Sequence, residues 1–479
     1  MVQSREVVVG ESSSHLESFK AYDVRGRVPD ELNEKMAELI GAAYAAFIRP
    51  SKVVVGYDIR LTSPALSRAL CRGIQNAGVD VVDIGRVGTE EVYFATFSLG
   101  LDGGIMVTAS HNPKDYNGMK FTRDLARPIS ADTGLLDIER AVVAALRDKS
   151  SAETGGASSP VRTPGKIESL DNRACYVEHL LTYIDTEKLK PLKIVVNAGN
   201  GGAGPVIDLL EKRLPFELVK INHEPDGNFP NGVPNPLLPG NRAATAEAVL
   251  AARADLGVAW DGDFDRCFFF DEAGEFVEGY YLVGLLAQRA LKRHPGANII
   301  HDPRLVWNTL EMVEEAGGVP VLSKSGHAFI KEKMRAVDAA YGGEMSAHQY
   351  FKEFSYCDSG MIPWLQVAEA ISVRGRPLSA LVADRIARFP VSGEINLTLD
   401  NPAAALAAMR RAYAGAALSV DETDGLSIEF PRWRFNVRMS NTEPVVRVNV
   451  ETRADIALLE ERTAEVLAAL RAAGGGGAE

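Results

Sequence analysis

The sequence predicts an α/β protein with several domains, and three observations support this class. The chain has 479 residues, which exceeds the size of one hydrophobic core, so we expect three or four domains. Through most of the chain, short apolar runs alternate with amphipathic helical patterns, which predicts mixed, mostly parallel sheets flanked by helices. Residues 389–479 instead show a strand, a helix, several strands and a long helix, the pattern of a smaller α+β domain.

The predicted strands are short apolar runs that end in turns or polar loops, and the predicted helices have one apolar face. The strands are expected at residues 51–58, 79–85, 104–107, 192–197, 256–260, 298–302 and 393–399. The helices are expected at residues 30–47, 63–77, 131–149, 169–184, 402–413 and 454–473. The strand-to-loop passages at 53–58, 194–198 and 299–303 are similar, which indicates three related α/β units.

The composition excludes several classes of function. A net charge of −12 without a Lys/Arg cluster argues against nucleic-acid binding. No apolar run approaches the ~20 residues of a membrane span, so we expect no membrane association. Four scattered cysteines (Cys71, Cys175, Cys267 and Cys357) show no spacing for zinc or a redox motif, which favours reduced thiols in a cytoplasmic protein. The polar residues 1–18 suggest a disordered leader.

Composition also suggests where the domains meet. Residues 150–165 are rich in Ser, Gly, Thr and Pro, which is typical of a linker. We therefore expect four domains, at residues 1–165, 166–275, 276–388 and 389–479.

The loop at 108–113, Thr-Ala-Ser-His-Asn-Pro, places the Ser110 hydroxyl at the end of a buried strand, where ligands bind in open α/β sheets. His111 is adjacent, and a turn predicted at 116–119 would bring Lys120 back toward the loop. These three groups favour a serine that carries a phosphoryl group. A Ser-His-Asp hydrolase is the rival interpretation. Against it, neighbouring side chains of an extended segment point to opposite sides, so His111 should point away from Ser110, and the G-x-S-x-G motif is absent.

A second loop, Asp-Gly-Asp-Phe-Asp-Arg at 261–266, follows another apolar strand. Asp261, Asp263 and Asp265 would repel one another on a tight loop unless a cation lay between them. Hard carboxylate oxygens suit Mg²⁺. If a phosphate on Ser110 supplied a further oxygen, both loops would form one site, and Arg266 could steady the phosphate.

Two further loops carry groups for a sugar phosphate. In 342–348, Glu344 and Ser346 should lie on one side of an extended segment and could bind neighbouring sugar hydroxyls. In 438–447, two arginines, two hydroxyls and an amide surround a turn at a proline, a set suited to a phosphate monoester.

Together these segments resemble the α-D-phosphohexomutase family, in particular its bacterial phosphomannomutase/phosphoglucomutase members. The resemblance covers about residues 19–470 and rests on 19–26, 108–113, 226–231, 261–266, 343–351 and 438–447. It implies four domains around a central cleft. It also implies reversible transfer of a phosphoryl group between O1 and O6 of mannose or glucose phosphate, through a phosphoserine and a hexose 1,6-bisphosphate.

The resemblance implies a role for each matching residue. Mg²⁺ would bind Ser110, Asp261, Asp263 and Asp265. The catalytic residues would be Ser110, Lys120, His327, His111, Arg25 and Arg266, with proton transfer by Lys120 and His327. The substrate-binding residues would be Tyr22, Arg304, Glu344, Ser346, His348, Arg438, Ser440, Asn441, Thr442 and Arg447.

Three alternatives stay open at this point: a Mg²⁺-dependent sugar-phosphate phosphatase, a non-catalytic sugar-phosphate binder and a phosphoglucosamine mutase. The expected partner is a hexose phosphate, and the expected state is a monomer or weak dimer. The sequence leaves the choice between mannose and glucose open.

Overall fold

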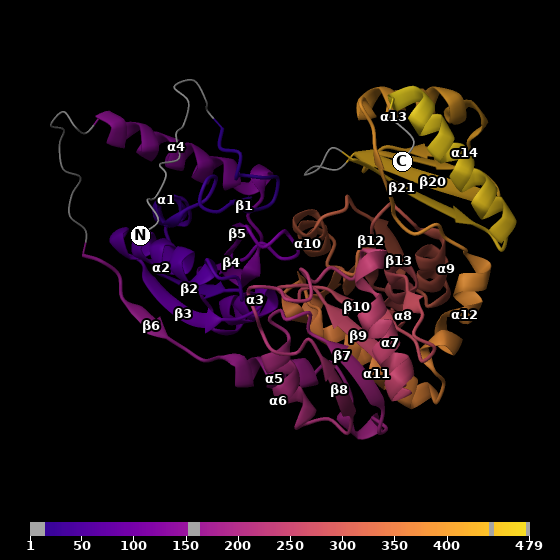
Figure 1. Ribbon diagram of the computed structural model, residues 1–479, viewed down its shortest axis with the longest axis horizontal. Coiled ribbons are helices and arrows are strands. Elements are labelled where there is room, and N and C mark those ends of the chain that lie inside the picture. Colours follow the sequence, from indigo (N-terminus) through magenta and orange to yellow (C-terminus); the bar gives the residue numbers. More distant parts are fainter. Residues whose placement is uncertain (1–14, 152–162, 440–444, 476–479) are drawn as a thin grey trace. The chain divides into compact units, whose positions relative to one another are not determined.

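The computed structural model describes residues 15–151, 163–439 and 445–475 (Figure 1). The contacts divide the chain into two compact units. Unit 1 comprises residues 1–270 and 357–373, and unit 2 comprises residues 271–356 and 374–479. In the described residues, no helix has both the length and the apolar composition needed to cross a membrane. The boundaries of the four predicted domains stay a prediction.

The first sheet of unit 1 has the strand order β1-β5-β4-β2-β3-β6. Its strands are β1 (Val24–Arg27), β2 (Lys52–Tyr57), β3 (Asp80–Arg86), β4 (Gly103–Val107), β5 (Tyr116–Arg123) and β6 (Ile167–Ser169). The accompanying helices are α1 (Glu34–Ile48), α2 (Ser63–Asn76), α3 (Thr89–Ser98) and α4 (Leu135–Ser151). β2 runs parallel to β3 and β4, and β5 returns antiparallel to β4. All five residues of β4 are buried, so the loop that follows β4 starts from the core.

The second sheet of unit 1 has the order β10-β9-β7-β8. The strands that belong to unit 1 are β7 (Lys193–Asn197), β8 (Glu217–Ile221), β9 (Leu256–Trp260) and β10 (Cys267–Phe270). The helices are α5 (Arg173–Leu181), α6 (Gly204–Glu211), α7 (Ala243–Ala252) and α11 (Met361–Arg374). Trp364 of α11 packs edge-on against Trp260, and Trp260 Nε1 donates to the Gly360 carbonyl at 3.0 Å. These contacts join residues 357–373 to the second sheet.

Unit 2 contains a mixed sheet and an antiparallel sheet. In the mixed sheet the order is β13-β12-β14-β15, formed by β12 (Asn298–His301), β13 (Val319–Leu322), β14 (Tyr341–Gly343) and β15 (Gln349–Phe351). Its helices are α8 (Gly279–Arg293), α9 (Trp307–Glu315), α10 (His327–Ala336) and α12 (Leu378–Arg388).

The antiparallel sheet has the order β17-β21-β20-β19-β18, formed by β17 (Ile395–Thr398), β18 (Ser419–Asp421), β19 (Leu426–Glu429), β20 (Trp433–Met439) and β21 (Val445–Thr452). It packs with α13 (Pro402–Tyr413) and α14 (Ile456–Gly474), as expected for the smaller α+β part. Two short strands, β11 (Phe276–Val277) and β16 (Cys357–Asp358), complete the set.

The three α/β sheets share one local strand order, namely β5-β4-β2-β3, β10-β9-β7-β8 and β15-β14-β12-β13. Each sheet has two parallel central strands. The connection after one of them leads to one edge of the sheet, and the connection after the other leads to the opposite edge. The carboxyl ends of β2 and β4, of β7 and β9, and of β12 and β14 are therefore topological switch points, where open α/β sheets bind ligands. The similarity noted between three strand-to-loop passages is thus confirmed as a repeated topology.

Several predicted boundaries are corrected by local interactions. The helix predicted from residue 30 begins at Glu34, because Asn33 Oδ1 accepts from the Met36 N–H at 3.0 Å and caps it. The helix predicted at 169–184 is shorter, Arg173–Leu181. The turn predicted at 116–119 is wrong: these residues lie in β5, which brings Lys120 opposite Met106 of β4.

The disordered leader predicted at residues 1–18 is wrong for residues 15–18. Residues 1–14 lie outside the described residues, but Leu16 is buried in the core of the first sheet. Its N–H donates to the Glu139 carboxylate at 2.6 Å, and the Ser18 carbonyl accepts from the Arg25 N–H at 2.6 Å. The chain is therefore packed before Phe19, where we expected order to begin.

Candidate functional site

The Ser110 loop lies at the first switch point, directly after β4. Ser110 has φ 46°, a left-handed conformation that a serine adopts only when its surroundings impose it. Thr108 provides one restraint: its hydroxyl donates to Asp58 at 2.7 Å and accepts from the Ser110 N–H at 2.9 Å. The loop therefore presents the Ser110 side chain in a fixed direction.

Arg60, which was not predicted from the sequence as a site residue, binds the backbone of the same loop. Its guanidinium donates to the carbonyls of Ser110 at 2.9 Å, Asn112 at 2.6 Å, Pro113 at 2.7 Å and Tyr116 at 2.9 Å. Asp58, at 3.4 Å from Arg60 Nε, balances the charge. One buried arginine thus binds four carbonyls between Ser110 and Tyr116 and restrains this segment.

The Ser110 hydroxyl has two close neighbours. Its Oγ lies 2.7 Å from Asp261 Oδ2 and 3.1 Å from His111 Nδ1. The expectation that His111 would point away from Ser110 is wrong, because the left-handed φ of Ser110 breaks the alternation of an extended segment. Burial, together with the nearby Arg266 guanidinium, lowers the pKa of His111 well below its usual value, so this imidazole is neutral.

Asp261, Asp263 and Asp265 lie on the loop after β9, at the second switch point. All three are buried, and one carboxylate oxygen of each lies within 4.8 Å of the others. Gly262 carries no positive φ; its role is close approach, because a Cβ at this position would lie 2.6 Å from the Ser110 carbonyl oxygen. The two loops that the sequence paired are in direct contact.

Two cationic side chains, Lys120 and Arg266, contact the carboxylates, and Arg25 is bonded to the serine loop. Lys120 Nζ donates to Asp263 at 2.8 Å and to Asp265 at 2.6 Å, and Arg266 Nη2 donates to Asp261 at 2.9 Å. Burial opposes the charge of Lys120, but the two aspartates outweigh it and raise the pKa of the ammonium. Arg25 Nη1 donates to the Ala109 carbonyl at 3.1 Å and Nε donates to Asp23 at 2.7 Å. The roles of these three side chains at the reacting end stay a prediction.

The carboxylate triplet fits a divalent cation. Asp263 Oδ1 is buried and has no hydrogen-bond partner within the described part of the chain, so this oxygen is available as a ligand. Lys120 lowers the pKa of Asp263 despite burial, which keeps the carboxylate ionised. Hard, ionised oxygen ligands around one point suit Mg²⁺ better than a soft metal.

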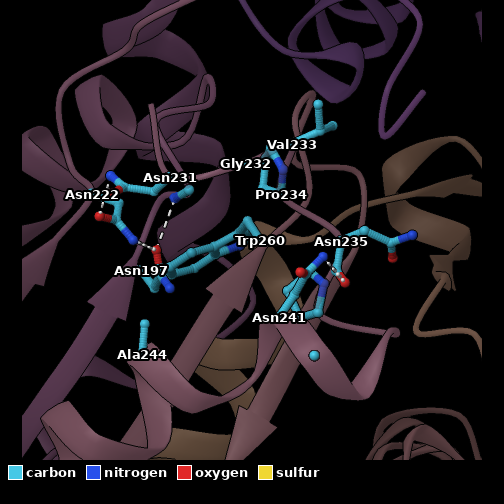
Figure 2. A pocket seen from close by; sticks show the side chains of 13 residues that line it. Asn197, Asn222, Asn231, Gly232, Val233, Pro234, Asn235, Asn241, Ala244 and Trp260 are labelled. Carbon is cyan, nitrogen blue, oxygen red and sulfur yellow. Dashed lines mark hydrogen bonds between the residues drawn. The ribbon is translucent and has the colours of Figure 1, made fainter. Parts of the chain in front are cut away.

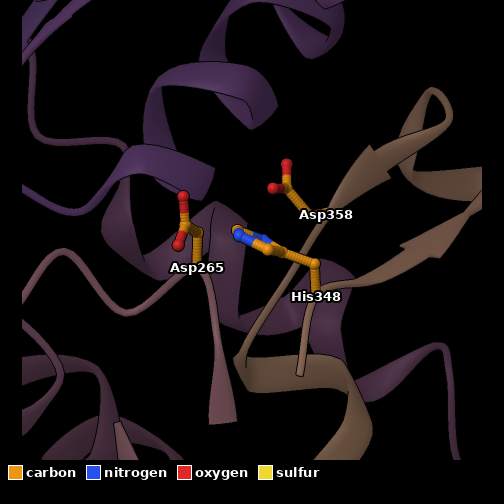
Figure 3. A group of neighbouring side chains, drawn as sticks. All are labelled: Asp265, His348 and Asp358. Carbon is orange, nitrogen blue, oxygen red and sulfur yellow. The ribbon is translucent and has the colours of Figure 1, made fainter. Parts of the chain in front are cut away.

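Two polar neighbours of the triplet were missed in the sequence. Thr89, at the start of α3, donates its hydroxyl to Asp263 at 2.5 Å. Asp358 of β16 places a carboxylate oxygen within 4.8 Å of one on Asp265, and both belong to unit 1 (Figure 3). Neither belongs to a recognisable motif, because both lie far along the chain from the Asp261 loop. Tyr22, predicted to bind substrate, is half-buried in the bend before β1.

In unit 2, Arg304 follows β12 at the third switch point and is 1% exposed. Its guanidinium makes two hydrogen bonds to Asp302, at 3.0 and 2.8 Å, and Nη2 also lies 3.3 Å from Glu344 and 3.1 Å from Ser346. Arg304, which was predicted to bind substrate, thus contacts and orients Glu344 and Ser346. Tyr350 OH donates to Glu344 Oε2 at 2.6 Å and fixes the other carboxylate oxygen.

The Glu344 loop is a hairpin between β14 and β15, so the prediction of an extended segment is wrong. Ala347 has φ 73° and donates its N–H to the Glu344 carbonyl at 3.0 Å. Glu344 and Ser346 nevertheless contact the same guanidinium, that of Arg304. The rings of His327, at the start of α10, and His348 lie 6.5 Å apart, which brings these two predicted residues together.

Arg438 and Arg447 are register partners on β20 and β21. Each lies 3.8 Å from a carboxylate oxygen of Glu394, a residue that the sequence did not suggest. Arg438 Nε is buried with no hydrogen-bond partner among the described residues, which leaves a donor for an anion. The predicted ligands Ser440, Asn441 and Thr442 lie outside the described residues.

A repeated α/β topology with a serine hydroxyl beside buried carboxylates, and an arginine pair on a C-terminal sheet, defines an enzyme of the phosphohexomutase type. Models of phosphoglucomutase/phosphomannomutase domains match nearly the whole chain: alpha/beta/alpha domain I at residues 16–145, domain II at 174–274, domain III at 278–389 and the C-terminal domain at 394–469. The chain belongs to the phosphoglucomutase/phosphomannomutase family, whose members are typically magnesium-dependent.

Named relatives agree with this membership. The chain is 60% identical to the phosphohexose mutases of Xanthomonas campestris pv. campestris, over 95% of this chain and 99% of the relative. It is 56% identical to the phosphomannomutase of Escherichia coli K12, with the same two coverages. A crystal structure of a phosphoglucomutase/phosphomannomutase family protein from Burkholderia thailandensis superimposes with a TM-score of 0.84 at 35% identity, over 96% of this chain and 98% of that one.

Proposed function

We propose that this enzyme moves a phosphoryl group reversibly between O1 and O6 of a hexose phosphate through a phosphoserine at Ser110 and a hexose 1,6-bisphosphate. One observation carries the proposal: Ser110 Oγ lies 2.7 Å from Asp261 Oδ2, within a set of three buried carboxylates that Lys120 and Arg266 neutralise. A phosphate on Ser110 would be repelled by these carboxylates unless a cation joined them. A Mg²⁺ ion held by the triplet supplies that charge.

The transfer divides into two half-reactions that use the same serine. In the first, the bond between phosphorus and Ser110 Oγ breaks, a bond to the substrate O6 forms, the O6 proton leaves, and Ser110 Oγ takes up a proton. The bisphosphate then turns over, and in the second the bond between phosphorus and O1 breaks, a bond to Ser110 Oγ forms, the serine proton leaves, and O1 takes up a proton. Such transfers depend on positioning and charge neutralisation more than on covalent chemistry.

The proposed roles follow from the contacts within each unit. In unit 1, Lys120 stays protonated beside its two aspartates and can donate its proton to a leaving oxygen. Arg25 and Arg266 stabilise charge on the transferred group. His111 is neutral and lies beside the Ser110 hydroxyl. Asp261, Asp263 and Asp265 hold Mg²⁺.

In unit 2, Glu344 and Ser346 bind sugar hydroxyls, with Arg304 as their positioning residue. Arg438 and Arg447 bind the phosphate that does not react, because their pairing across two strands presents two guanidinium groups side by side. His327 and His348 complete this cluster, with His327 as a second proton carrier.

Mannose and glucose phosphates are the proposed substrates, supported by the name phosphomannomutase of the Escherichia coli relative and by the name of the family. Glu344 and Ser346 can bind hydroxyls that the 1- and 6-phosphates share, which a reversible mutase requires. We place the enzyme in the cytoplasm as a monomer or weak dimer; four free cysteines among the described residues fit a reducing compartment.

The proposal is tested by offering glucose 1-phosphate and mannose 1-phosphate to the enzyme with Mg²⁺ and following 6-phosphate and free phosphate together. We expect 6-phosphate without accumulating free phosphate, and an intact mass that carries one phosphate on the wild type but not on Ser110→Ala. Ser67→Ala is the control, since this serine is buried on α2.

Steady release of free phosphate without 6-phosphate would establish the phosphatase alternative instead. Turnover by Ser110→Ala at the wild-type rate would exclude a phosphoserine. Preference for glucosamine 1-phosphate over both hexoses would identify a phosphoglucosamine mutase.

A further inference from the structure

Unit 1 contains a cavity of about 290 Å³ that none of the proposed catalytic residues lines. It lies at the second switch point, between Asn197, the last residue of β7, and Trp260, the last residue of β9 (Figure 2). The chain leaves β7 toward β8 and leaves β9 toward β10, which opens the sheet edge between them. Open α/β sheets bind ligands at such an edge, and here the cavity adjoins Trp260, which directly precedes the acidic loop.

Asparagine amides dominate the polar lining. Asn231 Nδ2 donates to Asn222 Oδ1 at 2.8 Å, Asn222 Nδ2 donates to Asn197 Oδ1 at 3.2 Å, and Asn197 Nδ2 donates to Thr245 Oγ1 at 2.9 Å. This chain of hydrogen bonds fixes the orientation of three amides on one side of the cavity (Figure 2). The donor and acceptor positions are therefore in place before a ligand arrives, which reduces the entropy lost on binding.

The rest of the lining combines Asn235 and Asn241 with apolar residues. Asn241 Nδ2 donates to the Asn235 carbonyl at 3.1 Å, and an amide has further donor and acceptor capacity beyond one such bond. Val233, Pro234, Pro236 and Ala244 supply apolar lining, and Trp260 lies beneath them with no exposed surface of its own. The Trp260 indole donates to the Gly360 carbonyl at 3.0 Å, which restrains its position.

The lining also excludes classes of ligand. Of the described residues that line the cavity, none has an ionisable side chain. A phosphate or carboxylate would enter without a counter-charge, which is costly in a partly enclosed site. The site instead offers amides, which match hydroxyl groups that both donate and accept, and a small apolar part at Val233 and Ala244, which matches C–H groups of a sugar ring. Its volume is close to the lower end of the range for small-molecule sites, about 300–1,000 Å³.

We propose that this cavity binds an uncharged, hydroxyl-rich molecule of monosaccharide size. This site is separate from the proposed transfer site, and its occupant needs no phosphate. The inference does not depend on the phosphoserine mechanism, because it follows from the cavity and its lining alone.

Methyl α-D-mannopyranoside is a suitable probe, because it carries no phosphate and cannot be turned over. We expect saturable binding to the full-length enzyme in calorimetry or saturation-transfer NMR, with Kd about 1 mM, the affinity within reach of so small a ligand. Binding should be unchanged when hexose phosphate saturates the transfer site. Displacement by hexose phosphate would place the probe in the transfer site and overturn the proposal.

Ala244→Leu is the test variant. Ala244 is an exposed residue on α7 whose side chain faces the cavity, so leucine would fill it without replacing a core residue (Figure 2). Ala243→Leu is the matched control, because Ala243 is also exposed on α7 but does not line the cavity. We expect Ala244→Leu to weaken binding by at least about tenfold and the control to keep the wild-type affinity. Mutase activity should stay within about twofold in both.

Gly240→Gln is a second filling variant for the case that Ala244→Leu fails to fold. A Cβ on Gly240 meets no atom within 4 Å, and Gly240 lines the cavity, so the new side chain has room. It too should weaken binding. Unchanged probe affinity in the folded filling variants, or no saturable binding below about 50 mM, would overturn the proposal. So would saturable binding of adenosine in place of the sugar, since that would identify a site for planar bases.

Discussion

The carbonyl oxygen of Ser110 lies 2.6 Å from the position that a Cβ atom would occupy on Gly262. Only a glycine allows the acidic loop after β9 to approach the serine loop after β4 so closely, because any other residue would place a carbon atom inside van der Waals contact. This approach brings Asp261 within 2.7 Å of the Ser110 hydroxyl. The glycine therefore sets the distance between the predicted metal ligands and the predicted phosphate carrier.

Gly262→Ala should separate these two loops. The neighbour that must move is backbone, so we expect a loss of about 1–3 kcal/mol in the free energy of unfolding and a fall of about 10²-fold in kcat/KM. Urea denaturation and steady-state kinetics measure both. Gly240→Ala is the control and should be silent, since a Cβ there meets no atom within 4 Å. Wild-type kcat/KM in Gly262→Ala would show that the close approach is dispensable.

Lys120 pairs with Asp263 and Asp265, which are also predicted to bind Mg²⁺, so lysine and metal compete for the same oxygens. We expect Lys120→Met to bind Mg²⁺ about tenfold more tightly in calorimetry, because no ion pair has to be broken. Without metal the variant should lose about 3–5 kcal/mol of stability, since two buried carboxylates lose their counter-ion, and Mg²⁺ should restore much of it.

Lys52→Met is the control for this measurement, because Lys52 forms an exposed ion pair with Glu168. It should leave the Mg²⁺ affinity unchanged. Weaker Mg²⁺ binding by Lys120→Met would contradict competition between the ammonium and the metal.

Arg304→Lys should disturb sugar binding while keeping the charge. A lysine cannot reproduce the forked contact with Asp302 together with the contacts to Glu344 and Ser346. We expect kcat/KM to fall by about 10- to 100-fold, mainly through a higher KM. Arg385→Lys, a buried arginine that bonds Asn308 and Glu311, controls for the general cost of the exchange. An unchanged KM in Arg304→Lys would exclude a positioning role.

Glu90 gives unit 1 a pH-dependent stability. Burial raises the pKa of Glu90 well above its usual 4.5, although the carboxyl accepts from the Met361 N–H at 3.1 Å and the Gly360 N–H at 3.2 Å. Below pH 4.5 the carboxyl is protonated in both states, so its full contribution is present. Above that pH the unfolded chain ionises first, and the contribution is lost as the pH rises toward the folded-state pKa.

Glu90→Gln removes this titration and keeps an acceptor for both N–H groups. Its stability relative to the wild type, measured by urea denaturation, should therefore increase from pH 5 to pH 8, by an amount on the order of 1 kcal/mol. Glu247→Gln, an exposed position on α7, should show no such trend. A relative stability that falls with pH would show that Glu90 is ionised in the folded protein.

Local sequence determined most of the secondary structure. The helix predicted at 402–413 is α13 with the same limits, because Asn401 caps it by accepting from the Ala404 N–H at 3.0 Å and proline fits its first turn. The strand predicted at 256–260 is β9 with the same limits. The limits of such elements depend on interactions between residues that are close in sequence, so the local sequence pattern predicts them.

The positions of the Ser110 and Asp261 loops at strand ends also followed from sequence, since each comes after an apolar run. That they would form one site was expected from the need of three carboxylates for a cation and from the family resemblance. The structure supplied the distances and the reason for a glycine at position 262. Gly262 lies against the carbonyl of Ser110, which is 152 positions earlier in the chain.

Tertiary structure alone decided how each side chain is oriented and what it pairs with. Ser110 and His111 lie together because Thr108, Asp58 and Arg60 impose a left-handed turn that no local preference favours. Arg60 and Glu394 had no motif to mark them, since their partners come from separate segments of the chain. Contacts of this kind depend on how sheets and loops pack in space, which periodicity along a single chain does not encode.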